Sequence, residues 1–207
     1  MIYFEVHQDN PDQRKIHQVV TELRQGRIGI FPTDSVYGLA CLANNREGIE
    51  RICQIKNIKP EKEQFSLLCR DIQQVARFSR QIDNHIFRVI RRHVPGPYTF
   101  ILNANNELPK IIKNRKGTIG VRVPDHAILQ AILAQLDLPL ITTSIKRESE
   151  LEWDTYYLDP FELKEDFEKR VDFMIDGGMG NAEASTILDC TGNEIIILRQ
   201  GIGELDL

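Results

Sequence analysis

Residues 31–40 read Phe-Pro-Thr-Asp-Ser-Val-Tyr-Gly-Leu-Ala and follow the apolar run Ile28-Gly29-Ile30. Apolar residues on both sides of a polar centre predict a strand, a turn and a second strand. Pro32 fixes the backbone φ angle, Thr33 to Ser35 place oxygen-bearing side chains in a row, and Gly38 allows another group to approach closely. These properties suit a small polar ligand, and they suit equally an ordinary corner between two strands.

Strands and helices alternate along most of the chain. Short runs rich in β-branched and aromatic residues predict strands at 2–6, 65–69, 98–102, 118–124, 138–144, 171–175, 186–189 and 195–198. Apolar residues at helical spacing predict helices at 10–26, 44–56, 71–78, 83–92, 108–112, 125–136 and 159–170, the first of them capped by Asn10. This order predicts an α/β fold in which helices flank a twisted mixed sheet.

Length, hydropathy and cysteine spacing narrow the class of protein. A chain of 207 residues, 42% of them hydrophobic, can bury a core as one domain. The N-terminus lacks a signal-peptide pattern, and no window approaches the roughly 18 apolar residues of a membrane span. The four cysteines lie far apart and have no partner at metal-ligand spacing. We therefore expect a soluble cytoplasmic protein with reduced cysteines, no metal site and no membrane contact.

Charge is distributed unevenly along the chain. Residues 51–122 contain 15 lysines and arginines against 5 acidic residues, whereas residues 147–207 contain 5 against 16. If the basic side chains share one face, the protein presents a basic concave surface that suits phosphates or polyanions, despite its net charge of -4. The alternative is that these charges form separate, solvated helix faces.

The common signatures of nucleotide, protease and esterase sites are missing. The sequence contains no P-loop, no GxGxxG motif, no HExxH motif and no GxSxG nucleophile elbow. Hydroxyls and cations occur instead at the expected ends of strands and helices, a combination that suits carboxylate and phosphate oxygens. The candidate site residues are Thr33, Lys56, Thr99, Thr118, Arg122, Ser144, Ser185 and Arg199.

Six short motifs follow one another along the chain: PTDSVYGL at 32–39, PGPYT at 95–99, GVRVP at 120–124, TS at 143–144, STILD at 185–189 and LRQG at 198–201. Together they resemble, in order, the motifs of the YrdC/YciO family. The resemblance covers roughly residues 10–203 and is greatest to the YciO branch, which has no long C-terminal extension. It implies a single YrdC-like domain over residues 1–207, with a twisted α/β sheet and a large basic concave face.

The resemblance also implies a chemistry. Well-understood members of the family make threonylcarbamoyl-AMP from L-threonine, bicarbonate and ATP, the first stage of the N6-threonylcarbamoyladenosine modification of tRNA. The implied partners are therefore ATP as a substrate with Mg²⁺, L-threonine, and structured RNA or tRNA, without a bound prosthetic group. The positions implied for substrate contact are Thr33, Arg122 and Ser185. The positions implied for the nucleotide side are Lys56, Thr99, Thr118, Ser144 and Arg199.

Two positions depart from the pattern of the synthases. Those enzymes place an arginine two residues after the lysine and an asparagine two residues after the serine, where this chain has Ile58 and Lys146. Lys59 and Lys62 could supply charge nearby, but a lysine cannot reproduce the forked hydrogen bonding of a guanidinium.

Two functions stay open. One is a synthase-like enzyme acting on ATP and a carboxylate, and the other is an RNA-binding paralogue with weak or no synthase activity.

Overall fold

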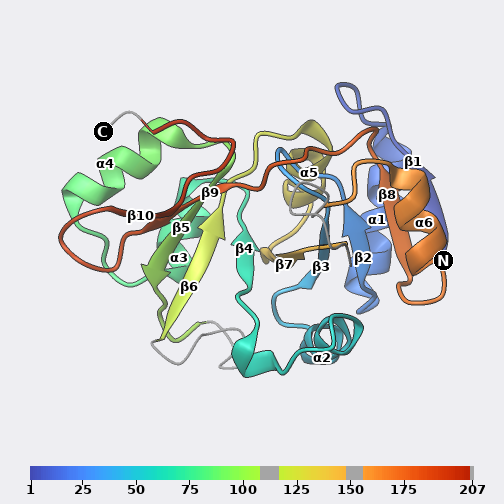
Figure 1. Ribbon diagram of the computed structural model, residues 1–207, viewed down its shortest axis with the longest axis horizontal. Coiled ribbons are helices and arrows are strands. Elements are labelled where there is room, and N and C mark those ends of the chain that lie inside the picture. The colour runs from blue at the N-terminus through green and yellow to red at the C-terminus, as the bar shows by residue number, and fades with distance from the viewer. Residues whose placement is uncertain (108–116, 148–155, 206–207) are drawn as a thin grey trace.

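Ten strands join into one mixed sheet in the computed structural model, which describes residues 1–107, 117–147 and 156–205 (Figure 1). The strands are β1 (Ile2–Glu5), β2 (Gly29–Phe31), β3 (Gly38–Leu42), β4 (Ser66–Leu68), β5 (Tyr98–Asn103), β6 (Thr118–Arg122), β7 (Leu140–Ser144), β8 (Phe173–Asp176), β9 (Thr186–Asp189) and β10 (Ile196–Arg199). Their order across the sheet is β1-β8-β2-β3-β7-β4-β6-β5-β9-β10. Parallel pairs such as β4 with β6 stand beside antiparallel pairs such as β3 with β7, which confirms the predicted mixed sheet.

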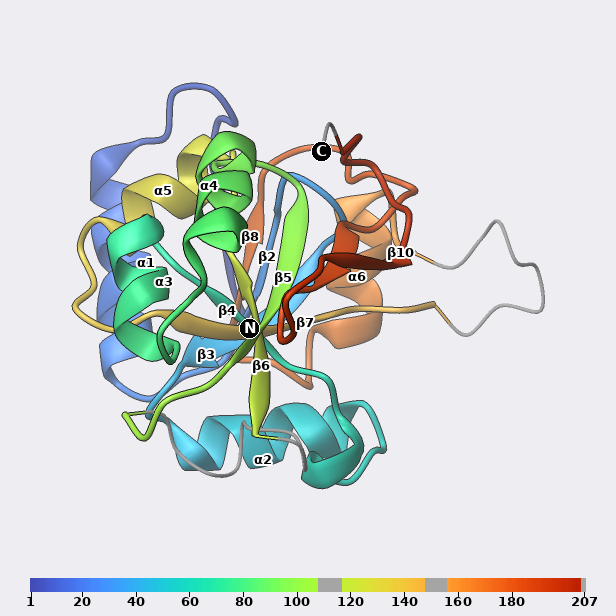
Figure 2. The ribbon, with the colours of Figure 1, turned by 90° about the vertical axis from the view of Figure 1, so that its left-hand side faces the viewer.

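Helices surround this sheet on several sides (Figures 1 and 2). The described helices are α1 (Gln13–Arg24), α2 (Arg46–Ile55), α3 (Ile72–Phe78), α4 (Asn84–His93), α5 (Ala127–Leu133) and α6 (Pro160–Phe167), with one 3₁₀ turn, η1 (Pro60–Lys62). The expected helix at 108–112 lies outside the described residues. No helix of the described residues is long and apolar enough to cross a membrane.

Side-chain caps explain where the helices begin. The side chains of Asn45, Asp71, Asp83 and Asp159 accept a hydrogen bond from the backbone of the first turn of α2, α3, α4 and α6, at or next to the predicted positions. The first helix differs from its prediction, because the Asp12 carboxylate accepts from the backbone N–H of Arg14 and the helix begins at Gln13. Asn10 was therefore the wrong cap. Its backbone N–H donates instead to the His7 ring in the preceding loop.

Helix α5 is shorter than the predicted 125–136. The backbone N–H of Asp125 donates to the carboxylate of Asp34 at 2.9 Å, so this residue is fixed outside the helix. His126 has an extended backbone and becomes the N-cap, and the helix ends at Leu133. The difference arises from a contact between segments 91 residues apart, which helical periodicity alone does not contain.

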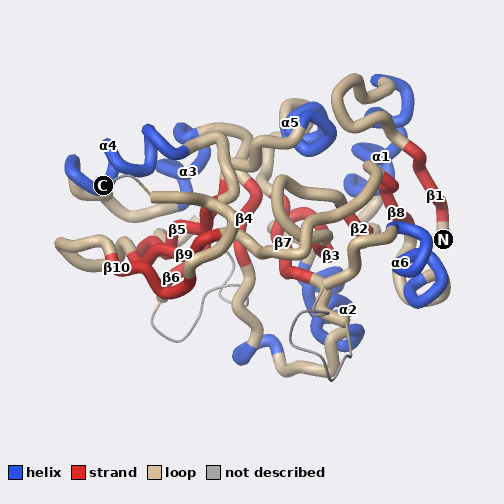
Figure 3. Tube along the Cα trace, turned by 45° about the horizontal axis from the view of Figure 1, so that its top comes forward, coloured by secondary structure: helices blue, strands red, loops and turns tan. Residues whose placement is uncertain are grey.

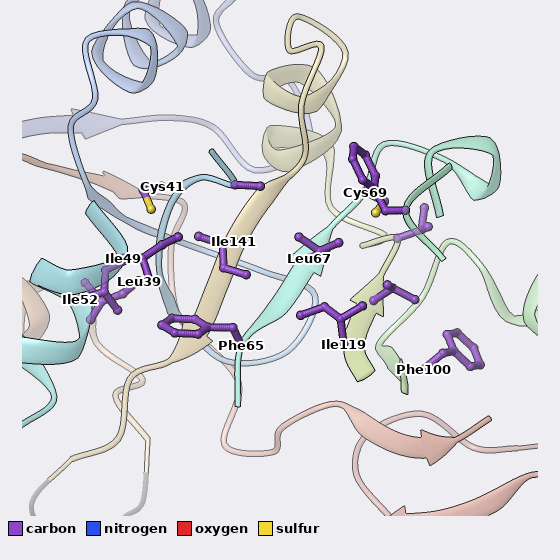
Figure 4. Packing of buried hydrophobic residues seen from close by; sticks show 14 of the residues in the cluster. Leu39, Cys41, Ile49, Ile52, Phe65, Leu67, Cys69, Phe100, Ile119 and Ile141 are labelled. Carbon is purple, nitrogen blue, oxygen red and sulfur yellow. The ribbon is translucent and has the colours of Figure 1, made fainter. Parts of the chain in front are cut away.

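Alternation along the strands divides the core into two clusters on opposite faces of the sheet. On one face, Leu39, Leu67 and Ile141 from neighbouring strands pack in the same cluster as Ile49 and Ile52 of α2 (Figure 4). On the other face, the residues next to these in sequence pack with α1 and α5; they are Ala40, Leu68 and Leu140. The middle strands are therefore packed on both faces, and these strands carry the polar site described below.

The end of α2 turns the chain toward the middle of the sheet. Asn57 adopts a left-handed conformation with φ of 52°, its N–H donates to the Gln54 carbonyl, and the N–H of Ile58 donates to the Cys53 carbonyl. These two bonds form a Schellman motif, in which asparagine is tolerated at the left-handed position. The chain then continues without helix or strand except at η1 until it enters β4 (Figure 3). Lys56 therefore stands at the helix end, as predicted.

Candidate functional site

A polar cleft of about 440 Å³ lies over the middle strands of the sheet. Its described lining contains five cations and a single carboxylate, that of Glu63. The cations are Lys56, Lys62, Arg122, Lys146 and Arg199. Hydroxyls from several strands and loops complete the polar lining, so the cleft offers many hydrogen-bond donors and an excess of positive charge.

Seven of the eight candidate residues from the sequence line this cleft. They are Thr33, Lys56, Thr99, Arg122, Ser144, Ser185 and Arg199. Thr118 does not belong to the lining, because it pairs with Asn103 at the far end of β6. It shares a face of the strand with Gly120 and Arg122, which explains why the pattern alone could not separate it from them. The ligand contacts of all eight residues stay predictions.

The turn from Thr33 to Val36 lines the cleft and is stabilised by its own hydroxyl groups. Thr33 Oγ1 donates to the carbonyl of Val36 at 2.8 Å and accepts from the backbone N–H of Ser35 at 3.0 Å. The Thr33 and Ser35 hydroxyl oxygens are 3.1 Å apart, and both residues are buried. Gly38, at the start of β3, has no room for a side chain, since a Cβ there would lie 2.8 Å from Thr142 Oγ1. The stretch therefore forms a corner between two strands and lines the cleft as well, and its contact with a small polar ligand stays a prediction.

Arg122, at the end of β6, is held in place by hydrogen bonds and an ion pair. Its Nη2 donates to Asp34 Oδ1 at 2.5 Å and to Ser35 Oγ at 2.9 Å, and the ion-paired side chains of Arg122 and Asp34 are 8% and 6% exposed. The carboxylate of Asp34 thus binds the guanidinium on one side. Arg122 Nε is also buried and has no hydrogen-bond partner within the described residues. A buried donor of this kind costs free energy until an acceptor satisfies it.

Lys56 is held by two hydrogen-bond acceptors and one counter-ion on one side of the cleft. Its ammonium donates to Thr143 Oγ1 at 2.5 Å and to the Ser144 carbonyl at 3.3 Å, and it forms an ion pair with Glu63 Oε2 at 2.9 Å. Thr143 Oγ1 donates in turn to Glu63 Oε1 at 3.0 Å. The lysine, threonine and glutamate therefore form a closed triangle. Glu63 was not among the sequence candidates, because it follows η1 in a segment with no periodic pattern.

A second group of hydroxyls joins β5 to the last two strands. Thr99 Oγ1 and Ser185 Oγ lie 2.8 Å apart, and both residues are buried. Arg199 donates through Nη2 to the carbonyl of Ser185 at 2.7 Å, which brings its guanidinium to the cleft from β10. Residues separated by 86 positions in the chain thus meet because β5 and β9 are parallel neighbours.

Both positions that depart from the synthase pattern lie in the cleft. Ile58 and Lys146 belong to its lining, as do Lys62 and Gln64. Lys59, which the sequence offers as a substitute charge, is not part of that lining, whereas Lys62 is. Ser35 and Glu63 line the cleft but were not among the candidate site residues. Ser35 belongs to the row of oxygen-bearing side chains at 33–35 that the sequence analysis singled out, whereas Glu63 has no comparable signal.

The basic residues of 51–122 are more dispersed than predicted. Among those described, Lys56, Lys62 and Arg122 line the cleft. Others form ion pairs elsewhere on the molecule: Arg51–Asp172, Arg70–Asp71 and Arg77–Glu107. The expectation that these side chains mainly share one concave face is therefore supported only for the cations that line the cleft, since α2 lies well apart from α3 and α4 (Figure 2).

The described residues offer no centre for metal or thiol chemistry. They contain no group of three or more His, Cys, Asp or Glu side chains that could hold a metal ion. All four cysteines are free and buried. Burial raises the pKa of the Cys53 thiol to about 11 and that of Cys41 and Cys190 to about 12, which keeps these thiols protonated near neutral pH.

Sequence comparisons find related proteins over most of the chain. The family model Sua5_yciO_yrdC, described as "Telomere recombination", matches residues 21–201. The chain is 37% identical over 204 residues to the uncharacterized protein YciO of Escherichia coli K12, covering 98% of this chain and 97% of that one. It is 30% identical over 142 residues to a threonylcarbamoyl-AMP synthase of Vibrio vulnificus, covering 68% and 76%.

Solved structures show the same fold. The crystal structure of E. coli YciO matches with a TM-score of 0.90 and covers 99% of this chain and 98% of its own. The crystal structure of P. abyssi Sua5 complexed with L-threonine matches with a TM-score of 0.86 at 24% identity and covers 97% of this chain but 58% of its own. The second likeness concerns the fold alone.

Proposed function

The chain belongs to the Sua5/YciO/YrdC family, and on that basis we propose that its cleft binds ATP together with a small carboxylate, L-threonine, and performs the reaction of a threonylcarbamoyl-AMP synthase. The observation that carries the proposal is the charge of the cleft, with five cations against one carboxylate in its described lining. ATP and a carboxylate repel each other, and cations between them offset that repulsion.

The reaction forms two bonds in sequence. The amine of L-threonine attacks the carbon of bicarbonate, and loss of water gives a carbamate. A carbamate oxygen then attacks the α-phosphorus of ATP while the bond to the β-phosphate oxygen breaks, and pyrophosphate leaves. Neither step requires a covalent bond to the protein. The chain's part is to hold the reacting groups together and to stabilise the charge on the phosphates.

For the amino-acid side of the cleft we assign Thr33, Arg122 and Ser185. A guanidinium suits a carboxylate, and the buried Nε of Arg122 is a donor that a carboxylate oxygen would satisfy. The ion pair with Asp34 fixes the guanidinium before the ligand arrives, which lowers the entropy lost on binding.

For the nucleotide side we assign four residues of the lining: Lys56, Thr99, Ser144 and Arg199. Thr118 lies outside the lining, so no ligand contact is assigned to it. Mg²⁺ belongs to this scheme as a companion of the ATP phosphates, because magnesium usually keeps its waters and binds through substrate phosphates. We also propose that the protein acts in the cytoplasm, which supplies ATP and contains the tRNA whose modification needs the product.

A direct assay tests the proposal. Purified protein is incubated with ATP, bicarbonate and labelled L-threonine, and the products threonylcarbamoyl-AMP and pyrophosphate are measured. Omission of bicarbonate and the Arg122→Lys variant serve as controls, because the variant keeps the charge but loses the guanidinium fork. Absence of both ATP binding and product would contradict the proposal.

A second function, binding of structured RNA, is favoured by the outer face of α4. Arg88, Arg91 and Arg92 are exposed on this helix, and none of them forms an ion pair with a described residue. Three unpaired arginines on one short helix suit the phosphates of a nucleic acid backbone. In this proposal the RNA contacts α4, at the edge of the molecule, rather than the cleft (Figure 1).

A further inference from the structure

Lys56 enters the cleft with two hydrogen bonds and one ion pair to groups of the protein. An ammonium has three N–H donors. In this chain two acceptors take hydrogen bonds from them, Thr143 Oγ1 at 2.5 Å and the Ser144 carbonyl at 3.3 Å. Glu63 Oε2 lies 2.9 Å from the ammonium as its ion-pair partner, and this buried oxygen accepts no hydrogen bond within the described residues. The lysine side chain is 22% exposed and the glutamate side chain only 8% exposed, so the pair is shielded from water.

The other cations of the cleft differ from Lys56 in this respect. Arg122 is balanced by the buried carboxylate of Asp34, which lies outside the cleft lining. Lys62, Lys146 and Arg199 form no ion pair with a described carboxylate. Lys56 is thus the cation whose counter-ion stands in the described lining of the cleft itself.

We infer that Glu63 competes with ligand phosphate for Lys56 and thereby sets how tightly this cleft binds phosphate-bearing ligands. The inference rests on the proposed nucleotide site. A phosphate oxygen that binds the Lys56 ammonium takes the place of the counter-ion that Glu63 now supplies. A carboxylate beside an incoming phosphate is repelled by it, so the ion pair with Glu63, which includes no hydrogen bond, is the contact that opens.

Thr143 makes the competition reversible. Its hydroxyl accepts from Lys56 and donates to Glu63 Oε1 at 3.0 Å, so it keeps the carboxylate near the lysine when their direct contact opens. The cleft without a ligand therefore carries its own anion in place of the phosphate. A ligand without phosphate does not compete with Glu63 for Lys56. Glu63 therefore distinguishes ligands with phosphate from ligands without it by their charge rather than by their shape.

The Glu63→Gln variant tests this inference, because it keeps the size of the side chain and removes its charge. Calorimetric titration of wild type and variant with pyrophosphate, ATP and adenosine is expected to show about tenfold tighter binding of the first two by the variant, or about 1.4 kcal/mol, with adenosine unchanged. Glu61→Gln is the matched control, since Glu61 is exposed on η1 outside the described lining and its loss should change nothing.

The Lys56→Gln background separates competition from a purely structural role. With the lysine neutral, Glu63→Gln should no longer tighten pyrophosphate binding, and the neutral pair also guards against misfolding caused by an uncompensated lysine. Equal or weaker binding of pyrophosphate by Glu63→Gln than by wild type overturns this inference alone. Failure of wild type and all variants to bind either ATP or pyrophosphate overturns the proposed function as well.

Discussion

At the scale of single residues, we predict that Ile58 and Lys146 limit the rate of the proposed reaction. Wild-type protein should bind ATP and turn over L-threonine feebly, because Ile58 cannot make the forked contact to oxygens that an arginine makes. Changing Ile58→Arg together with Lys146→Asn should raise the rate, by on the order of a hundredfold if one oxyanion contact is restored. Product formation by each single variant and by the pair gives the measurement. Robust synthesis by wild type would show that Lys62 or another cation of the lining replaces the missing arginine.

The buried pair of Arg122 and Asp34 supports a prediction about stability. Asp34→Asn leaves the guanidinium uncompensated at a site where both side chains are less than a tenth exposed, and it should lower the free energy of unfolding by about 3 kcal/mol or more. Urea denaturation measures the loss. The exposed pair of Arg46 and Glu50 is the control, and Glu50→Gln should change stability by less than about 0.5 kcal/mol. Equal effects of the two changes would contradict the argument.

Residues at strand ends could be predicted from the sequence, and residues held by tertiary contacts could not. Thr33 follows β2, Arg122 ends β6 and Ser185 directly precedes β9, so local pattern places all three at ends of strands, and all three line the cleft. Glu63 has no such marker, since its position is fixed by Lys56 and Thr143 across the cleft. The family resemblance could not supply it either, because the quoted motifs do not include it.

At the scale of elements, α4 is the surface on which the RNA proposal depends. Replacing Arg88, Arg91 and Arg92 by glutamine should weaken binding of duplex RNA severalfold or more and reduce the steepness of its salt dependence, because each lost phosphate contact releases one counterion fewer. Filter binding or fluorescence anisotropy at several salt concentrations checks this. Arg14→Gln on the exposed face of α1 should have no effect. The same salt slope before and after the triple change would rule out α4 as the contact.

The first residues of the helices could not be predicted from the sequence pattern as well as the helices themselves. Asn10 and Asp12 are both good capping residues, and only the bond from the Arg14 N–H to Asp12 decides between them. The start of α5 depends on the carboxylate of Asp34, which accepts a hydrogen bond from the backbone N–H of Asp125, a residue far away in the sequence. Periodicity therefore identified each of these helices, while the competition for backbone donors fixed their first residues.

At the scale of the whole molecule, the alternation of strands and helices predicts an α/β class but not the order of ten strands. Neighbours such as β1 and β8 are paired across most of the chain, with Ile2 opposite Phe173. Asp172, just before β8, helps to hold this arrangement. Its carboxylate accepts from the Ile28 backbone N–H at 2.9 Å and from Arg51 Nη1 of α2 at 2.7 Å, so one side chain joins three distant segments.

Those contacts predict how the stability of the fold depends on pH. Partial burial alone would raise the pKa of Asp172, but the hydrogen bonds from Arg51 and Ile28 outweigh burial and hold that pKa below its usual range. A carboxyl with a lowered folded-state pKa stabilises the protein above its unfolded value of about 3.9 and loses that contribution as the pH falls through the folded value. Asp172→Asn should therefore destabilise the protein at pH 7 in urea denaturation, and its difference from wild type should shrink as the pH falls from 5 toward 3. In an Arg51→Gln background the pH-dependent difference should be smaller, because the charge that lowers the pKa is gone. A difference that stays constant between pH 7 and pH 3 would mean that Asp172 acts through its shape and not through its charge.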